Sequence, residues 1–196
     1  ANAWETLTFN FANQATGTAA LNLAFTYNKA SVFFAFGTTG AGGGAGTYYF
    51  DELNFVAGGG GGGGGGTVAG LPIDFDTAGV TYTLTGFGGA EDATVAAGVA
   101  GANGSVARVV KSATAELWAG TTVSTGANQS IATIPFTATA RSMTLRVRAP
   151  AAGVVVRLKV EDAADPTRSV ETEATTTVAN AWETLTFNFA NQATGT

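Results

Sequence analysis

Residues that carry out acid–base or nucleophilic chemistry are few in this sequence, and they do not form a recognisable pair. The chain has no His and no Cys, so it lacks the side chains of serine-type and cysteine-type triads, the usual zinc ligands and the default general base near neutral pH. Glycoside hydrolysis needs two carboxylates that face each other across about 5 to 10 Å. The neighbouring acids fall in predicted turns and mark no such pair: Glu91, Asp92, Glu161, Asp162 and Asp165. We therefore expect a protein without enzymatic activity.

The composition is that of a folded, acidic chain. Hydrophobic residues make up 45% of the sequence and charged residues 12%, which leaves ample apolar material for a core. The net charge is −5 with only nine Lys and Arg, whereas binding to phosphate backbones needs a dense basic surface. Apolar runs reach about five to seven residues, far below the roughly 20 that cross a bilayer. We expect neither nucleic-acid binding nor membrane insertion.

The elements that must position any site are predicted to be strands. In VVVRLKVE, residues 154–161, apolar and charged side chains alternate, which is typical of a half-buried strand. TLRVR, residues 144–148, repeats this pattern, and TLTFNF, residues 6–11, places three apolar side chains on one face. Further strands are expected in LNLAFTY, SVFFAF and TYYFDELNF, whereas EDATVAAGVAGA is expected to form a short helical turn or an irregular loop.

Turn signals separate these short strands along the whole chain, among them DTAG, GANG, STGAN, APAAG and EDAADP. No segment has a sustained helical period with caps. Many short strands at close spacing predict an all-β fold, an antiparallel β-sandwich or jelly roll of about nine or ten strands.

The first eighteen residues, ANAWETLTFNFANQATGT, return unchanged as residues 179–196. The chain therefore contains an internal repeat, with an offset of 179 minus 1, or 178 residues. The nine consecutive glycines, Gly58–Gly66, are interpreted as a flexible linker between copies, because such a run buries nothing. On this reading residues 1–57 are the C-terminal part of one copy, and residues 67–196 are the N-terminal and central part of the next.

The two identical segments are expected to occupy the same strand position in a complete sandwich, so one sandwich has no place for both. Two arrangements then remain open. Half domains follow one another along one continuous polymer, or separate chains complete each other by donating strands. A third reading is a permuted domain in which the glycine run joins the original termini.

In the order that begins at residue 67, the sequence runs from LPIDFD through YTLTGFGGA, NGSVARVVKS, ELWAGTT and WETLTFNF to GTYYFDELNF. This series resembles the β-sandwich carbohydrate-binding modules attached to polysaccharide-degrading enzymes. The resemblance covers nearly the whole 178-residue unit apart from the linker, and it rests on the order and spacing of individually weak motifs.

The resemblance implies a structural calcium ion where the first strand of the module meets the last. The matching residues are Asp76 of LPIDFD and Asp51 of YYFDEL, with Asp74 on the same strand face as Asp76. Calcium takes six to eight oxygen ligands, which two or three carboxylates and backbone carbonyls can supply. The alternative is that these acids are solvated strand residues.

The resemblance also implies that aromatic faces stack on sugar rings. Trp4 and its repeat Trp182 point away from the apolar face of their strand, and Trp118, Tyr27 and Tyr82 are further candidates, with Tyr48 beside them. Packing inside the sandwich is the alternative role for each. Four basic side chains are expected to point outward on strands that could be neighbours: Arg146, Arg148, Arg157 and Lys159. They form either a solvated face or a contact surface for an acidic polysaccharide or an adjacent subunit.

Two functions compete. The identity between the repeated segments favours the repeating structural unit of a long secreted filament, sheath or adhesin, in which copies of the chain assemble head to tail. The alternative is a non-catalytic module that targets an enzyme to a polysaccharide. Both readings predict an extracellular or cell-surface protein with copies of itself, polysaccharide, or both as partners.

Overall fold

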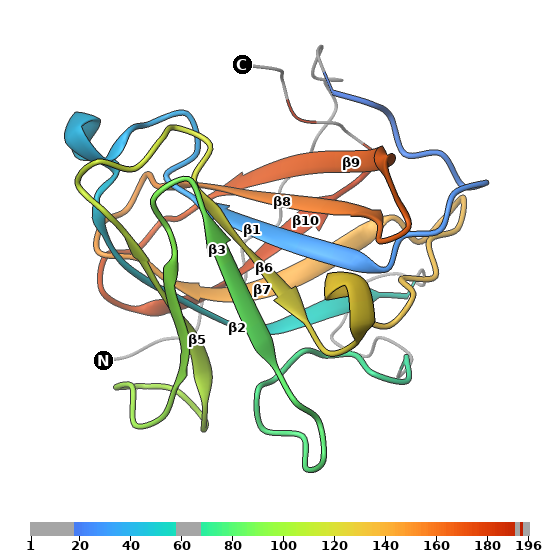
Figure 1. The fold of residues 1–196 in the computed structure, drawn as a ribbon, viewed down its shortest axis with the longest axis horizontal. Coiled ribbons are helices and arrows are strands. Elements are labelled where there is room, and N and C mark those ends of the chain that lie inside the picture. The colour runs from blue at the N-terminus through green and yellow to red at the C-terminus, as the bar shows by residue number, and fades with distance from the viewer. Residues whose placement is uncertain (1–17, 58–67, 191–192, 194–196) are drawn as a thin grey trace.

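Ten antiparallel strands form two five-stranded sheets in the computed structural model, which describes residues 18–57, 68–190 and 193 (Figure 1). The strands are β1 (Lys29–Phe34), β2 (Gly46–Val56), β3 (Thr83–Phe87), β4 (Asp92–Ala96), β5 (Val106–Lys111), β6 (Gly120–Ser124), β7 (Ser142–Arg148), β8 (Val155–Asp162), β9 (Asp165–Thr175) and β10 (Trp182–Asn188). A π-helical turn, η1 (Gly40–Gly44), and a 3-10 turn, η2 (Ala127–Gln129), complete the elements of the described residues.

The strands are divided between a β1 sheet, with the order β3-β6-β1-β8-β9, and a β2 sheet, with the order β10-β7-β2-β5-β4. In Figure 1 the β1 sheet lies nearer the viewer and crosses in front of the β2 sheet. This arrangement confirms the predicted all-β sandwich and its number of strands.

Strands from both sides of the glycine run lie in each sheet. β1, which precedes the run, pairs with β6 and β8, and β2 pairs with β5 and β7. The two parts of the chain therefore build one sandwich together in the described residues. The position of the boundary between successive copies stays a prediction.

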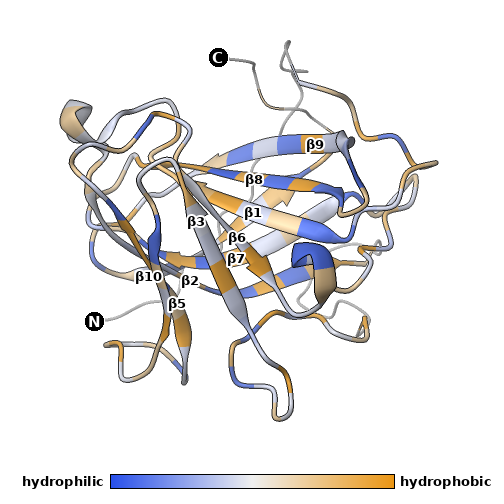
Figure 2. Cartoon of the chain, in the orientation of Figure 1, coloured by the Kyte–Doolittle hydropathy of each residue, from blue (hydrophilic) through white to orange (hydrophobic). Residues whose placement is uncertain are grey.

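The core between the sheets is built by the side chains that the alternation placed inward. On β8, Val156, Leu158 and Val160 are fully buried, and Figure 2 shows apolar and polar positions alternating along the strands. On β7 and β10 the inward set is also fully buried: Leu145, Val147, Leu185 and Phe187. Each such side chain contributes about 1.5–3 kcal/mol of hydrophobic stabilisation, so these strands are held mainly by their inner faces.

Two predicted elements differ from the structure. LNLAFTY, residues 21–27, is not a strand but a turn, because the Asn22 side chain accepts the N–H of Ala24 and its carbonyl accepts the N–H of Phe25. EDATVAAGVAGA contains an edge strand, β4, which pairs with β5. Within the described part of the chain, no helix has the length and apolar character needed to cross a membrane.

Candidate functional site

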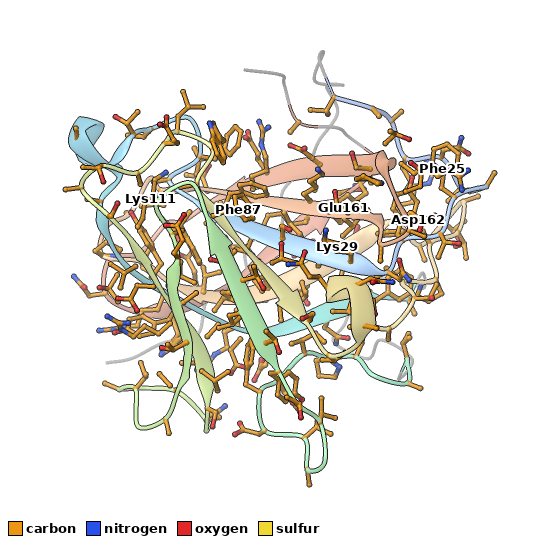
Figure 3. The ribbon with its side chains drawn as sticks, in the orientation of Figure 1. Phe25, Lys29, Phe87, Lys111, Glu161 and Asp162 are labelled. Carbon is orange, nitrogen blue, oxygen red and sulfur yellow. The ribbon has the colours of Figure 1, made fainter. Side chains whose placement is uncertain are left out.

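A groove of about 670 Å³ lies on the outer face of the β1 sheet. All five strands of that sheet contribute lining residues, and Figure 3 shows Phe87, Lys29 and Glu161 on this side of the molecule. The strands and adjoining loops supply the following residues: Thr18, Lys29, Ser31, Phe33, Phe36, Thr85, Phe87, Trp118, Thr122, Gln129, Arg157, Lys159, Glu161 and Glu171. Neighbouring strands are about 4.8 Å apart, so the floor spans roughly 19 Å from β3 to β9.

A row of polar side chains crosses the floor of the groove, one from each strand. The register pairs Thr85 with Thr122, Thr122 with Ser31, Ser31 with Lys159 and Lys159 with Glu171. The hydroxyls of Ser31 and Thr122 share a hydrogen bond of 2.8 Å. Because all five residues occupy directly paired positions, they share one face, and they form a continuous line of hydrogen-bonding groups.

A second row beside it is aromatic. The Phe33 ring meets Phe87 edge to face at 5.6 Å and Phe36 at 5.7 Å, and the Phe87 ring stacks on Trp118 at 6.2 Å. Gly120 lies beneath Phe33 and Phe87, where an added Cβ would come within 2.6 and 2.8 Å of the two rings. Trp118 is 48% exposed, whereas Phe33 is buried and Phe36 and Phe87 are half-buried, so the indole is the ring of this row that solvent reaches most.

The charged side chains of the groove neutralise one another. Arg157 donates to Glu171 at 2.9 Å and approaches Glu173 at 2.6 Å. Its guanidinium also lies 3.5 Å from the centre of the Phe36 ring. Glu161 accepts from Lys29 at 3.0 Å and from Lys159 at 2.8 Å. The groove thus offers fixed donors and acceptors without a large net charge.

Glu161 is held in its ionised form by these contacts. Burial raises the pKa of this carboxyl, but hydrogen bonds and charge from Lys159 and Lys29 outweigh burial, so the pKa lies below its usual value of 4.5. A general acid for glycoside hydrolysis needs the opposite shift. This carboxylate is therefore suited to accepting hydrogen bonds rather than to donating a proton.

The structure brings one of the predicted sugar-stacking residues to the groove, Trp118. Tyr27 is buried, with its hydroxyl donating to the Asn22 carbonyl and its ring against Phe136. Tyr82 is half-buried, and its hydroxyl donates to Asp74 at 2.7 Å.

The remaining aromatic candidates lie elsewhere. Trp182 points to the outer face of the β2 sheet as predicted, but it is only 8% exposed, and its indole N–H donates to the Ala100 carbonyl. Tyr48 is buried and stacked on Phe34. Trp4 lies outside the described residues.

The three carboxylates predicted to bind calcium have different interaction partners in the structure. Asp51 is buried, and its carboxylate accepts a long contact from Arg146 Nη1, 3.4 Å. Burial is the main cause that raises the pKa of Asp51 to about 6, and the charges of Glu52 and Asp76 add to the rise. The hydrogen bond from the Glu52 backbone N–H and the charge of Arg146 offset this rise only in part. Asp76 accepts the Ser105 N–H.

Asp74 does not join this pair, since both its oxygens accept the Thr77 hydroxyl and one also accepts Tyr82. In the described ranges no three or more Asp or Glu side chains are grouped as metal ligands. Asp51 and Asp76 together carry more negative charge than Arg146 neutralises, which suits a cation. Asp74, the third predicted carboxylate, is instead hydrogen-bonded to Thr77 and Tyr82. Calcium binding here stays a prediction.

The outward basic set is not one surface, and this prediction was wrong. Arg146 and Arg148 lie on β7 of the β2 sheet, whereas Arg157 and Lys159 lie on β8 of the β1 sheet. The two pairs face opposite sides of the sandwich. Arg146 is fully buried under Trp182, with its guanidinium 4.4 Å from the indole ring.

Sequence reasoning missed most of the groove. Phe33 was overlooked because SVFFAF is apolar on both faces, which hides the side that points outward. The available signal was the adjacent pair Phe33 and Phe34, because neighbouring residues of a strand point to opposite faces and one of the two rings must lie outward. Ser31, Thr85 and Thr122 carry no signal of their own, because their alignment depends on pairing between β1, β3 and β6.

No protein-family model, curated protein or solved structure matches this chain. The site is therefore interpreted from its own geometry.

Proposed function

We propose that the protein binds a neutral polysaccharide in the groove on the outer face of the β1 sheet. The single observation that carries this proposal is the pairing of an aromatic row, which ends at the exposed Trp118, with a parallel row of hydroxyl and charged groups. Sugar rings have apolar C–H faces and polar edges, and these two rows match that division.

The charge balance of the groove supports a neutral ligand. The three cations Lys29, Arg157 and Lys159 are paired with three carboxylates, Glu161, Glu171 and Glu173. An acidic polysaccharide would have to compete with these carboxylates for the cations. A neutral chain can accept and donate hydrogen bonds without separating the pairs.

The same pairing supports binding rather than hydrolysis. Each of the three carboxylates accepts from a Lys or Arg side chain, and the pKa of Glu161 is lowered rather than raised. Neither a proton donor nor a pair of free carboxylates facing across the groove is present among the described groove residues. The role that fits is that of a module that holds a polysaccharide.

The test is a binding screen against neutral and acidic polysaccharides by affinity electrophoresis and calorimetry. We expect binding to neutral polysaccharides, weakened at least tenfold by Trp118→Ala, which corresponds to about 1.4 kcal/mol. Tyr49→Ala, on the outer face of the opposite sheet, is the matched control and should bind normally. Absence of binding to every neutral polysaccharide, or an equal loss in both variants, would overturn the proposal.

The repeated segment favours a second candidate function, the structural unit of a secreted filament, sheath or adhesin. Residues 179–196, identical to residues 1–18, include β10, a complete strand of the sandwich. Electron microscopy of the native material should then reveal fibres with an axial repeat of one sandwich. Discrete particles of about one domain in mass would exclude this function while leaving the sugar-binding proposal intact.

A further inference from the structure

The loop between β4 and β5 carries an exposed asparagine that is followed by a glycine. Asn103 and Gly104 both lie at the surface in a bend of the chain, outside any strand. Asparagine is among the chemically labile residues of proteins. Its side-chain amide reacts when the next backbone nitrogen approaches the amide carbon, and a following glycine, which has no Cβ, obstructs that approach least. The pair therefore has the residue types that spontaneous deamidation requires.

Hydrogen bonding sets Asn103 apart from most other asparagines. The structure describes seven asparagines, and in five of them the side-chain amide is hydrogen-bonded: Asn22, Asn28, Asn54, Asn180 and Asn188. Within residues 18–57 and 68–190, the side chains of Asn103 and Asn128 have no such partner. Gln129 follows Asn128, so Asn103 is the one of these two that precedes a glycine.

The backbone beside Asn103 leaves the reacting nitrogen accessible. Asp76 accepts the Ser105 N–H at 2.9 Å, whereas the Gly104 N–H has no hydrogen-bond partner among the described residues. Gly104 has a φ of 134°, and a Cβ added there would overlap the Asp76 carboxylate. This conformation and this contact both exclude a larger residue, so the fold itself requires the glycine that makes Asn103 reactive.

We propose that Asn103 deamidates spontaneously in the folded protein, and that the isoaspartate product opens the loop over Trp182. The Gly104 nitrogen loses its proton to solvent and attacks Asn103 Cγ. The new N–Cγ bond closes a succinimide ring, while the Cγ–Nδ2 bond breaks and releases ammonia. Water then adds to either ring carbonyl and leaves aspartate or isoaspartate, so the reaction consumes only water. This inference does not rest on sugar binding.

The same loop supplies the contacts that cover Trp182. The Ala100 carbonyl accepts the Trp182 indole N–H at 3.0 Å. The Gly101 carbonyl accepts Arg146 Nη2 at 2.7 Å. Isoaspartate adds one carbon to the backbone between these carbonyls and the anchored Ser105, so the loop must shift. Aspartate keeps the length of the backbone and adds only a charge.

The first test follows the full-length chain in mildly alkaline buffer by peptide mass mapping. We expect Asn103 to convert at least about tenfold faster than Asn128, which corresponds to a barrier lower by about 1.4 kcal/mol. Asn103→Gln should suppress the conversion, because the longer side chain cannot close the five-membered ring. Equal rates at Asn103 and Asn128 would overturn the proposal.

Unfolding in guanidinium chloride separates the effect of the fold from that of the dipeptide. In the unfolded chain both reacting atoms move freely, so its rate of conversion at Asn103 is the reference. We expect the folded chain to convert at no less than about one tenth of this rate, because a solvent-exposed loop adds little to the barrier. A slower folded rate would show that the loop holds Asn103 away from the Gly104 nitrogen, and the proposal would fail.

Oxidative footprinting of the separated products tests the effect on the loop. Trp182 should be oxidised several-fold faster in the isoaspartate form than in the parent, and Trp118, at the other sheet, should be unaffected. Asn103→Asp supplies the aspartate form as a matched control and should leave Trp182 protected. Equal oxidation of Trp182 in all three forms would contradict the opening of the loop.

Discussion

At the scale of single residues, the groove depends on how Glu161 is held. This side chain is 8% exposed and accepts from Lys29 on β1 and Lys159 on its own strand. Its pKa is lowered in the folded state, so the ionised form contributes stability above the unfolded value of 4.5. That contribution is lost as the pH falls through the folded pKa.

We expect Glu161→Gln to lower the unfolding free energy by about 1–3 kcal/mol near neutral pH, because it leaves two ammonium groups beside a neutral amide. The difference from the parent should shrink as the pH falls below 4.5. Urea unfolding at several pH values measures it. Glu116→Gln, on an exposed turn, serves as control, and a difference that stays constant down to pH 3 would contradict the role assigned to Glu161.

At the scale of elements, β6 supports the aromatic row because it begins with a glycine. Gly120 pairs with Phe87 on β3, and its missing side chain lets Phe33 and Phe87 lie over the strand. Trp118 lies two residues before Gly120, the first residue of β6, and stacks on Phe87. The start of this strand thus positions the exposed indole and the two rings together.

Gly120→Ala should weaken polysaccharide binding several-fold while leaving the sandwich folded. The new Cβ would contact Phe33 and Phe87 at 2.6 and 2.8 Å, so the rings must move on the groove side. Calorimetric titration and thermal unfolding measure the two effects. Thr47→Ala on β2 is a control in the other sheet, and unchanged affinity in Gly120→Ala would show that ring positions are not important for binding.

At the scale of the whole molecule, the two parts of the chain that the glycine run separates share both sheets. Leu53 and Ile73 join them at a further point, where they exchange backbone hydrogen bonds of 3.1 and 2.9 Å. Asp51 comes from the first part and Asp76 from the second. Their carboxylates lie close enough for Asp76 to raise the pKa of Asp51. A cation bound there would hold the two parts together.

Calcium is therefore expected to raise the Tm of the full-length protein relative to a chelator. The change should disappear in Asp51→Asn and persist in Asp74→Asn, because the Asp74 carboxylate is occupied by Thr77 and Tyr82. Scanning calorimetry with and without calcium measures it. An equal Tm with and without calcium would contradict this prediction. It would mean that Arg146 supplies all the positive charge that is bound beside Asp51 and Asp76.

Alternation within a strand is a local property, and it was readable from the sequence. The inward faces of residues 154–161 and 144–148, the all-β class and the outward direction of Trp182 followed from a period of two. The identity of the two repeated segments was equally plain, because it requires no structure. Two segments were exceptions. Side-chain hydrogen bonding at Asn22 overrides an apolar pattern, and residues 92–96 form the edge strand β4 through pairing with β5.

Pairing between strands depends on residues far apart in the chain, and only the tertiary structure decided it. In the tertiary structure Arg146 and Arg157 lie far from each other, because β7 and β8 belong to different sheets. The loop that carries Ala100 covers Trp182. Strand pairing also aligned Ser31 with Thr122 and Lys159 in one row. A strand pattern specifies which side of the chain faces the core, but the partner strand determines which outward side chains become neighbours.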